Sequence, residues 1–164
     1  MITREQLAWA MTRECDITQH LYGKLGPESR DYRPTPGQRS TVELLRYLAM
    51  CGIGGIRWFE SGSLDVWKEH LARVAEMPAE QFPDFMNRQK REIEEFFAST
   101  SEETLATKEA RLPTGDRMPL GAAIINGPLK WLAAYKLQLF LYAKITGATQ
   151  IGTANAWAGI DWPK

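Results

Sequence analysis

Apolar residues recur at steps of three and four over most of this chain, a pattern that predicts amphipathic helices. The first such stripe belongs to a helix over about residues 3–25, which ends at Gly26-Pro27. The members of this stripe are Leu7, Met11, Cys15, Thr18, Leu21, Tyr22 and Leu25.

A second helix is expected over residues 35–53. Thr35 can act as its N-cap, Pro36 suits the first helical position, and Gln38 can reach back as in a capping box. Three glycines near its end either stop the helix or let another backbone approach closely. They are Gly52, Gly54 and Gly55. The segment that follows, residues 57–62, is expected to form a turn.

Two shorter amphipathic stretches follow, at residues 64–77 and 83–98, and Pro78 separates them. The residues expected to face inward from the first are Trp67, Leu71, Val74 and Ala75. In the second, Gln89 lies inside an otherwise apolar stripe. Because a buried amide needs hydrogen-bond partners, Gln89 belongs either to a structural network or to a ligand contact.

The last long helix has the clearest pattern. It is expected to begin near residues 126–128 and to continue to Thr146, with Gly147 as its stop. The alternative is an earlier start near Leu120 with a kink at Pro128.

Shorter features connect and follow the long helices. Residues 100–103 form a capping-box pattern that opens a short helical turn, and turn residues at 112–116 allow a small hairpin near residues 108–119. In the tail, residues 148–164, Trp157 and Trp162 are expected to cover an end of the core. Together these elements predict an all-α fold: a four-helix bundle with short extra helical turns, forming a single domain over residues 1–164.

Composition narrows the function classes. With 20 Lys and Arg against 20 Asp and Glu, the chain has no net charge and lacks the broad basic surface of a nucleic-acid-binding protein. We therefore expect no nucleic-acid partner. No apolar run approaches the roughly 18–20 residues of a membrane span, and the polar start lacks the apolar centre of a signal peptide. The expectation is a cytoplasmic protein without a membrane partner.

Cysteines and histidines are few. The chain has two of each, which excludes the HExxH and three-histidine metal motifs. Cys15 and Cys51 fall on apolar faces, so we expect buried, inert thiols. His20 and His70 are expected on the exposed side or edge of their helices.

One face of the last helix carries most of the candidate chemistry. Its residues are Trp131, Tyr135, Gln138, Tyr142 and Ile145, spaced four, three, four and three apart. This face is either an aromatic core seam, the commoner case, or the lining of a partly polar cavity. Glu14, near the edge of the first stripe, is either a solvated flank residue or a pocket carboxylate.

Two stretches resemble a known family. The sequence RPTPGQRSTVELLRYLA, from Arg33 to Ala49, is similar to the second helix of the DinB-like bundle superfamily of bacterial putative metalloenzymes. LKWLAAYKLQLFLYAKITG, from Leu129 to Gly147, resembles its final helix. In this comparison Gln138, Tyr142, Lys144 and Gly147 stand where the family pattern places similar residues.

The resemblance implies a helical bundle that binds a divalent metal through three histidines. Such bundles are often dimeric, so we expect a homodimer. Relatives include thiol-dependent S-transferases and a maleylpyruvate isomerase. The three histidine positions correspond here to Tyr47, Trp131 and Tyr135. An indole N–H only donates, and a phenol ligates only as phenolate, so we expect no metal and no other cofactor. The three rings are instead expected to meet as an aromatic cluster.

Three functions stay open at this point, and the sequence leaves undecided whether the protein is an enzyme. The first is a metal-free protein that binds a small molecule in an aromatic-lined inter-helix pocket. Its candidate residues are Tyr47, Trp131, Tyr135 and Gln138, with Gln89 and Glu14 as additions. The alternatives are a thiol-dependent transferase or isomerase and a non-catalytic, homodimeric interaction protein.

Overall fold

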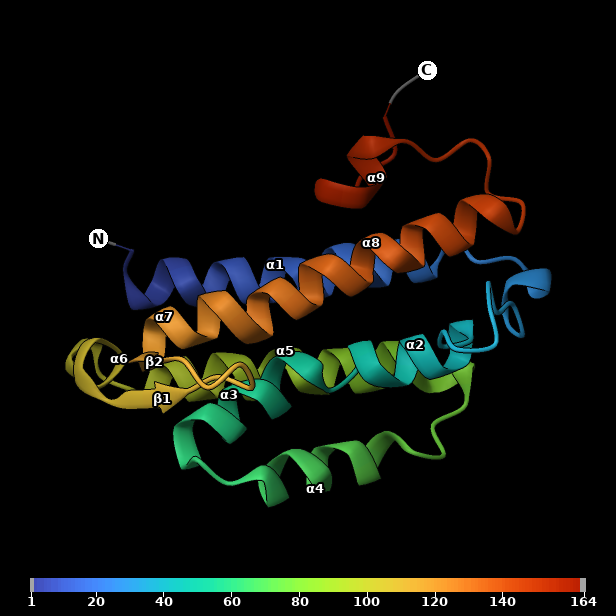
Figure 1. Cartoon of the computed structure of the whole chain (residues 1–164). Coiled ribbons are helices and arrows are strands. Elements are labelled where there is room, and N and C mark those ends of the chain that lie inside the picture. The colour runs from blue at the N-terminus through green and yellow to red at the C-terminus, as the bar shows by residue number, and fades with distance from the viewer. Residues whose placement is uncertain (1, 163–164) are drawn as a thin grey trace.

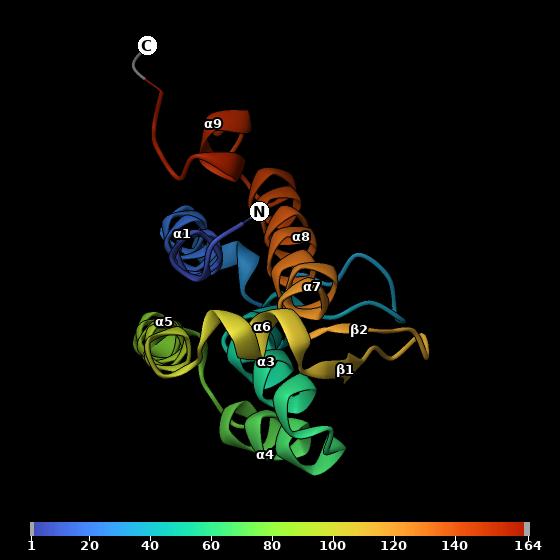
Figure 2. The same cartoon turned by 90° about the vertical axis from the view of Figure 1, so that its left-hand side faces the viewer.

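The computed structural model describes residues 2–162 and is built mainly from α-helices. Figure 1 shows α1 (Arg4–Tyr22) and α8 (Lys130–Ile145) side by side above α5 (Phe82–Ser99) and the consecutive helices α2 (Thr41–Leu48) and α3 (Cys51–Ser61). In the end-on view, α1, α8, α3 and α5 surround the centre of the molecule (Figure 2). The all-α prediction is confirmed.

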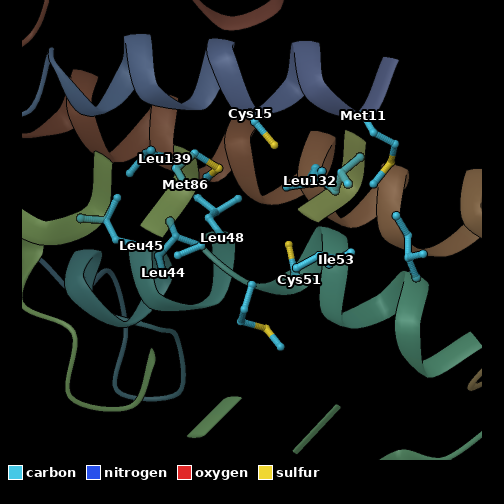
Figure 3. Close-up of a cluster of buried hydrophobic side chains, with 14 of the residues drawn as sticks. Met11, Cys15, Leu44, Leu45, Leu48, Cys51, Ile53, Met86, Leu132 and Leu139 are labelled. Carbon is cyan, nitrogen blue, oxygen red and sulfur yellow. The ribbon is translucent and has the colours of Figure 1, made fainter. Parts of the chain in front are cut away.

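Buried apolar side chains from these five helices fill the centre (Figure 3). The side chains labelled there are Met11 and Cys15 of α1, Leu44, Leu45 and Leu48 of α2, Cys51 and Ile53 of α3, Met86 of α5, and Leu132 and Leu139 of α8. The helix faces that the apolar stripes predict are therefore largely the faces that pack.

The start of the second helix differs from the prediction. Thr35 and Gln38 form a turn, in which the Gln38 N–H donates to the Thr35 carbonyl at 3.0 Å. Helix α2 begins after Ser40, which exchanges capping hydrogen bonds with Glu43. Both pairs fit the capping-box spacing, but only the Ser40–Glu43 box directly precedes the apolar stripe, and its carboxylate also pairs with Arg33 at 2.7 Å.

The end of this helix also differs. Helix α2 stops at Leu48, Met50 leaves helical geometry with φ −135° and ψ −22°, and α3 then continues to Ser61, through the segment predicted as a turn. Gly62, with φ 71°, caps α3. The three glycines lie inside α3 and do not stop it; they let neighbouring elements approach closely, which is the second of the two roles expected for them. A Cβ at Gly54, for example, would lie 3.1 Å from the Cβ of His70.

Helix α4 (Leu64–Val74) packs against α3 on the outside of the bundle (Figure 2). Val74 is buried and Trp67 is half-buried, as predicted, whereas Leu71 and Ala75 are exposed. These two were wrongly predicted to face inward because only a narrow strip of this outer helix meets α3.

The last long helix follows the alternative with the earlier start. Helix α7 (Leu120–Ile124) leads into a π-helical turn, η3 (Ile125–Leu129), which contains Pro128, and α8 continues from it. Proline has no N–H and its ring crowds the preceding turn, so a wider π turn accommodates it inside a continuous helical segment.

Short elements complete the fold. They are the 3-10 turns η1 (Pro27–Ser29) and η2 (Ala79–Gln81), helix α6 (Glu102–Thr107), strands β1 (Glu109–Arg111) and β2 (Arg117–Pro119), and helix α9 (Thr153–Trp157). The strands pair antiparallel, with Ala110 opposite Met118, which confirms the predicted hairpin. None of the described helices is both long and apolar enough to span a lipid bilayer.

The C-terminal segment corrects further predictions. Trp157 and Trp162 are 68% and 71% exposed and do not cover the core, while Ile151 and Asn155 are buried. Helix α9 packs on α1, where Asn155 Nδ2 lies 3.0 Å from His20 Nε2, so the His20 side chain is only 19% exposed. His70 is also buried, at 7%, because Gly54 lets it approach α3. The burial of either histidine could not be predicted from the apolar pattern of its own helix, because another element covers it.

Candidate ligand-binding face

Six aromatic side chains meet where α2, α3, α4 and α8 converge, and we call them the aromatic cluster. They are Tyr47, Trp58, Phe59, Trp67, Trp131 and Tyr135. The Tyr47 and Tyr135 ring centroids lie 4.6 Å apart at an interplanar angle of 62°. Trp67 joins Tyr47, at 6.1 Å, to Trp131, at 5.5 Å. The three residues that the sequence resemblance matches to histidines thus gather in one place, as expected, but Trp131 is connected through Trp67.

Small residues create the space for these rings. A Cβ at Gly55 would lie 2.6 Å from the Trp131 ring, and a Cβ at Gly127 would lie 2.5 Å from the Phe59 ring. Both distances are far below van der Waals contact. The glycines of α3 and of the π turn are therefore part of the aromatic cluster, because the rings occupy the volume that side chains there would need.

Arg39, just before α2, lies over the cluster. Its guanidinium carbon is 4.2 Å from the Tyr47 ring centroid and 5.2 Å from that of Tyr135. Among the residues that the structure describes, no carboxylate forms an ion pair with Arg39 and no acceptor binds its guanidinium N–H groups. The Arg39 side chain and all the cluster rings except Phe59 are half-buried, so part of this surface faces solvent.

Gln138 connects α8 to Arg39 through a tyrosine. The Gln138 Nε2 donates to the Tyr142 hydroxyl at 2.5 Å, and that hydroxyl donates to the Arg39 carbonyl at 2.9 Å. Tyr142 is buried and packs edge-on against Tyr32. Ile145, placed on the same face by its spacing, is 63% exposed and lies beyond this network.

The residues that the sequence resemblance matches to metal ligands do not fit a divalent metal. Burial raises the pKa of Tyr47 far above its usual range, and the neighbouring Cys51 and Tyr135 add to this effect. Tyr47 is therefore a neutral phenol near neutral pH, and the Trp131 indole only donates. Within residues 2–162, no three His, Cys, Asp or Glu side chains come close enough together to hold a metal.

The cysteines are not activated thiols. Cys15 and Cys51 are buried and unpaired within the described chain, as predicted. Burial raises the pKa of Cys15 to about 12, and it raises that of Cys51 well above the usual range. A nucleophilic cysteine needs an accessible thiolate, and these two thiols lie in the apolar core.

Gln89 supplies a structural network, one of the two alternatives left open. Its Nε2 donates to the Leu48 carbonyl at 2.8 Å, and its Oε1 accepts from the N–H groups of Gly52 at 2.9 Å and Ile53 at 3.2 Å. The side chain thus satisfies backbone groups on both sides of the break between α2 and α3. It lies in the core, away from the aromatic cluster.

Glu14 forms an ion pair with Lys136 at 2.6 Å between α1 and α8. The two side chains are only 19% and 7% exposed, so this is neither a solvated residue nor a carboxylate in the aromatic cluster. Two surface hollows are lined by residues outside the aromatic cluster: one of about 690 Å³ lies beside α9, and one of about 440 Å³ lies between the start of α1 and helices α6 and α7.

Comparison with known proteins supports the fold. No family model matches the sequence, and no curated protein sequence matches it. Among solved structures, the chain has the fold of a DinB-like protein. The structure that shows this is the crystal structure of YjoA from Bacillus subtilis, which is 15% identical and superimposes with a TM-score of 0.65 over 87% of this chain and 92% of that one. The resemblance in the two sequence stretches is thereby confirmed at the level of fold.

Proposed function

We propose that this protein is a metal-free, DinB-like binding protein that takes a small molecule against the aromatic cluster. The observation that carries the proposal is Arg39, a cation without an anionic partner that lies on the half-exposed rings of Tyr47 and Tyr135. Aromatic rings supply apolar contact area, and an unpaired guanidinium supplies orientation, which together are typical of small-molecule sites.

A direct test combines metal analysis with fragment binding. Protein purified without chelator is analysed for bound metal and then titrated with zinc; we expect neither near-stoichiometric metal nor tight zinc uptake. Aromatic fragments are then screened by saturation-transfer NMR. We expect binding to the wild type and to Trp157→Leu, a control at an exposed tryptophan, and loss of binding in Trp67→Leu. Fragments that bind Trp67→Leu as well as the wild type, or stoichiometric metal that is lost in Tyr47→Phe, would contradict the proposal.

The catalytic alternative receives less support. A thiol-dependent transferase or isomerase of this fold would need either an activated cysteine or a residue that activates an external thiol. Both cysteines are buried with raised pKa values, and Tyr47 stays protonated. The aromatic cluster therefore offers surface for binding and no group of its own that is poised as a base.

A second candidate, the homodimeric interaction protein, is favoured by one surface feature. Leu137, Leu141 and Ile145 follow one another at steps of four along α8 and are 50%, 48% and 63% exposed. Sedimentation over the micromolar range tests it. We expect a dimer that Leu141→Glu dissociates and that Leu64→Glu, at an exposed leucine of α4, does not. A monomer at every concentration would exclude this candidate.

A further inference from the structure

We infer that the ligand of the aromatic cluster is a planar organic anion, an arene carboxylate, whose carboxylate binds Arg39. This inference rests on the proposed function and adds the chemical class of the ligand. It is carried by the guanidinium, which is placed, oriented and left without an acceptor by the described residues around it.

The position of Arg39 is fixed from two sides. Its side chain lies across the Tyr47 and Tyr135 rings, and its backbone carbonyl accepts from the Tyr142 hydroxyl, which Gln138 holds in turn. Stacking on aromatic faces leaves the N–H edge of a guanidinium free, and that edge matches a carboxylate in a bidentate arrangement. Gln138 is thus a positioning residue for Arg39.

The charges around Arg39 favour an anion from solution. The neighbouring phenol Tyr47 is neutral, because burial raises its pKa. The nearby Arg33 is already paired with Glu43, and Lys136 on α8 is paired with Glu14. With those two cations paired, Arg39 is a cation on the cluster rings that has no carboxylate partner among the described residues, and a monoanion neutralises it.

The rings indicate what the anion carries. Trp67 packs against Tyr47, and Trp58 and Trp131 pack against Trp67. All three indoles are half-buried, so each keeps part of its surface exposed. A flat ring attached to the carboxylate would cover this surface through stacked or edge-on contacts. An aliphatic anion such as acetate would use the charge but leave the rings exposed.

Isothermal titration of the whole protein with three probes tests this inference. The probes are 2-naphthoate, its neutral amide 2-naphthamide, and acetate. For the wild type we expect 2-naphthoate to bind at least about tenfold more tightly than the amide, and acetate to bind more weakly than either, because only the acid uses both the charge and the rings. Added salt should weaken the binding of the acid and leave that of the amide unchanged.

Variants assign the effect to Arg39. Arg39→Gln should abolish the preference for the acid while binding of the amide stays within about twofold, which also shows that the variant is folded. Arg39→Lys should keep only part of the preference, because it retains the charge without the planar fork. Arg91→Gln, at an exposed arginine on α5, should behave as the wild type.

The outcomes separate the two proposals. If the amide binds as well as the acid and Trp67→Leu removes both, the ligand class is wrong and the proposed function stands. If acetate binds as tightly as 2-naphthoate, the site is a general anion site and the inference fails. If neither aromatic probe binds, both proposals fail.

Discussion

Replacing Gln89 by methionine should destabilise the protein through the break between α2 and α3. Methionine has nearly the same volume and length, so the packing around position 89 changes little. The substitution removes the acceptor for the N–H groups of Gly52 and Ile53 and the donor to the Leu48 carbonyl. Because the site is buried, water does not replace these partners, and backbone groups on both helices lose their hydrogen bonds.

The magnitude follows from the three hydrogen bonds. Each contributes about 1 kcal/mol net, so the free energy of unfolding should fall by about 3 kcal/mol. For a chain of this length, 1 kcal/mol corresponds to a change of roughly 2–4 °C in Tm, which gives a decrease of roughly 6–12 °C. Urea unfolding followed by circular dichroism measures the free energy, and calorimetry measures Tm.

Gln19→Met is the matched control, because the Gln19 amide makes a surface hydrogen bond to Asn87 on another helix. We expect a change within about 0.5 kcal/mol. Gln89→Glu adds a pH test. Only the protonated acid can donate to Leu48, and burial raises the pKa of the acid above its unfolded value. The stability of this variant, relative to the wild type, should therefore be greatest in acid and fall as pH rises through the folded pKa. A loss below 1 kcal/mol in Gln89→Met, or no pH effect in Gln89→Glu, would refute this account of the helix break.

Three further predictions concern the core. Glu14→Ala should lower the free energy of unfolding by about 3–5 kcal/mol, because it leaves the Lys136 charge buried without a partner. The double change Glu14→Leu with Lys136→Met should recover most of this loss in urea unfolding. If the double variant loses as much stability as Glu14→Ala, the prediction is contradicted. Gly55→Ala should cost about 1–3 kcal/mol in the same assay, because its Cβ would overlap a neighbouring ring, whereas Gly26→Ala, with open space around it, should be neutral. Burial lowers the pKa of His70 below 6.5, so the unfolded chain binds more protons and stability should fall as pH drops through about 6.5. His70→Leu should flatten that part of a pH–stability profile, and an unchanged slope would contradict the assignment.

Periodicity predicted the long helices because each buries one continuous face. It failed at the break after Leu48, since the apolar spacing from Leu44 through Leu48 to Cys51 continues across it without interruption. The break depends on Gln89, which is distant in sequence and satisfies the freed backbone groups. A local pattern contains no information about such a partner.

The aromatic cluster was predicted in part. Tyr47, Trp131 and Tyr135 were expected together, and the structure places all three in the aromatic cluster. Trp58 was missed because its segment was predicted as a turn, although α3 continues through it. Arg39 carried no periodic signal, since it stands in a loop and acquires its role from rings on two helices.

The aromatic cluster and the glycines beneath it are coupled features of this chain. Trp131 occupies space that is available only because residue 55 has no side chain, and it also packs beside Phe59, whose ring lies against Gly127. Histidine at position 131 would be smaller than tryptophan and would leave a void over Gly55, and a cavity in a packed core costs stability. Replacing the rings by histidines would therefore remove packing as well as introduce imidazoles. The backbone around Trp131 and Phe59 is therefore fitted to large aromatic rings, because the glycines beneath them leave the volume that the rings fill.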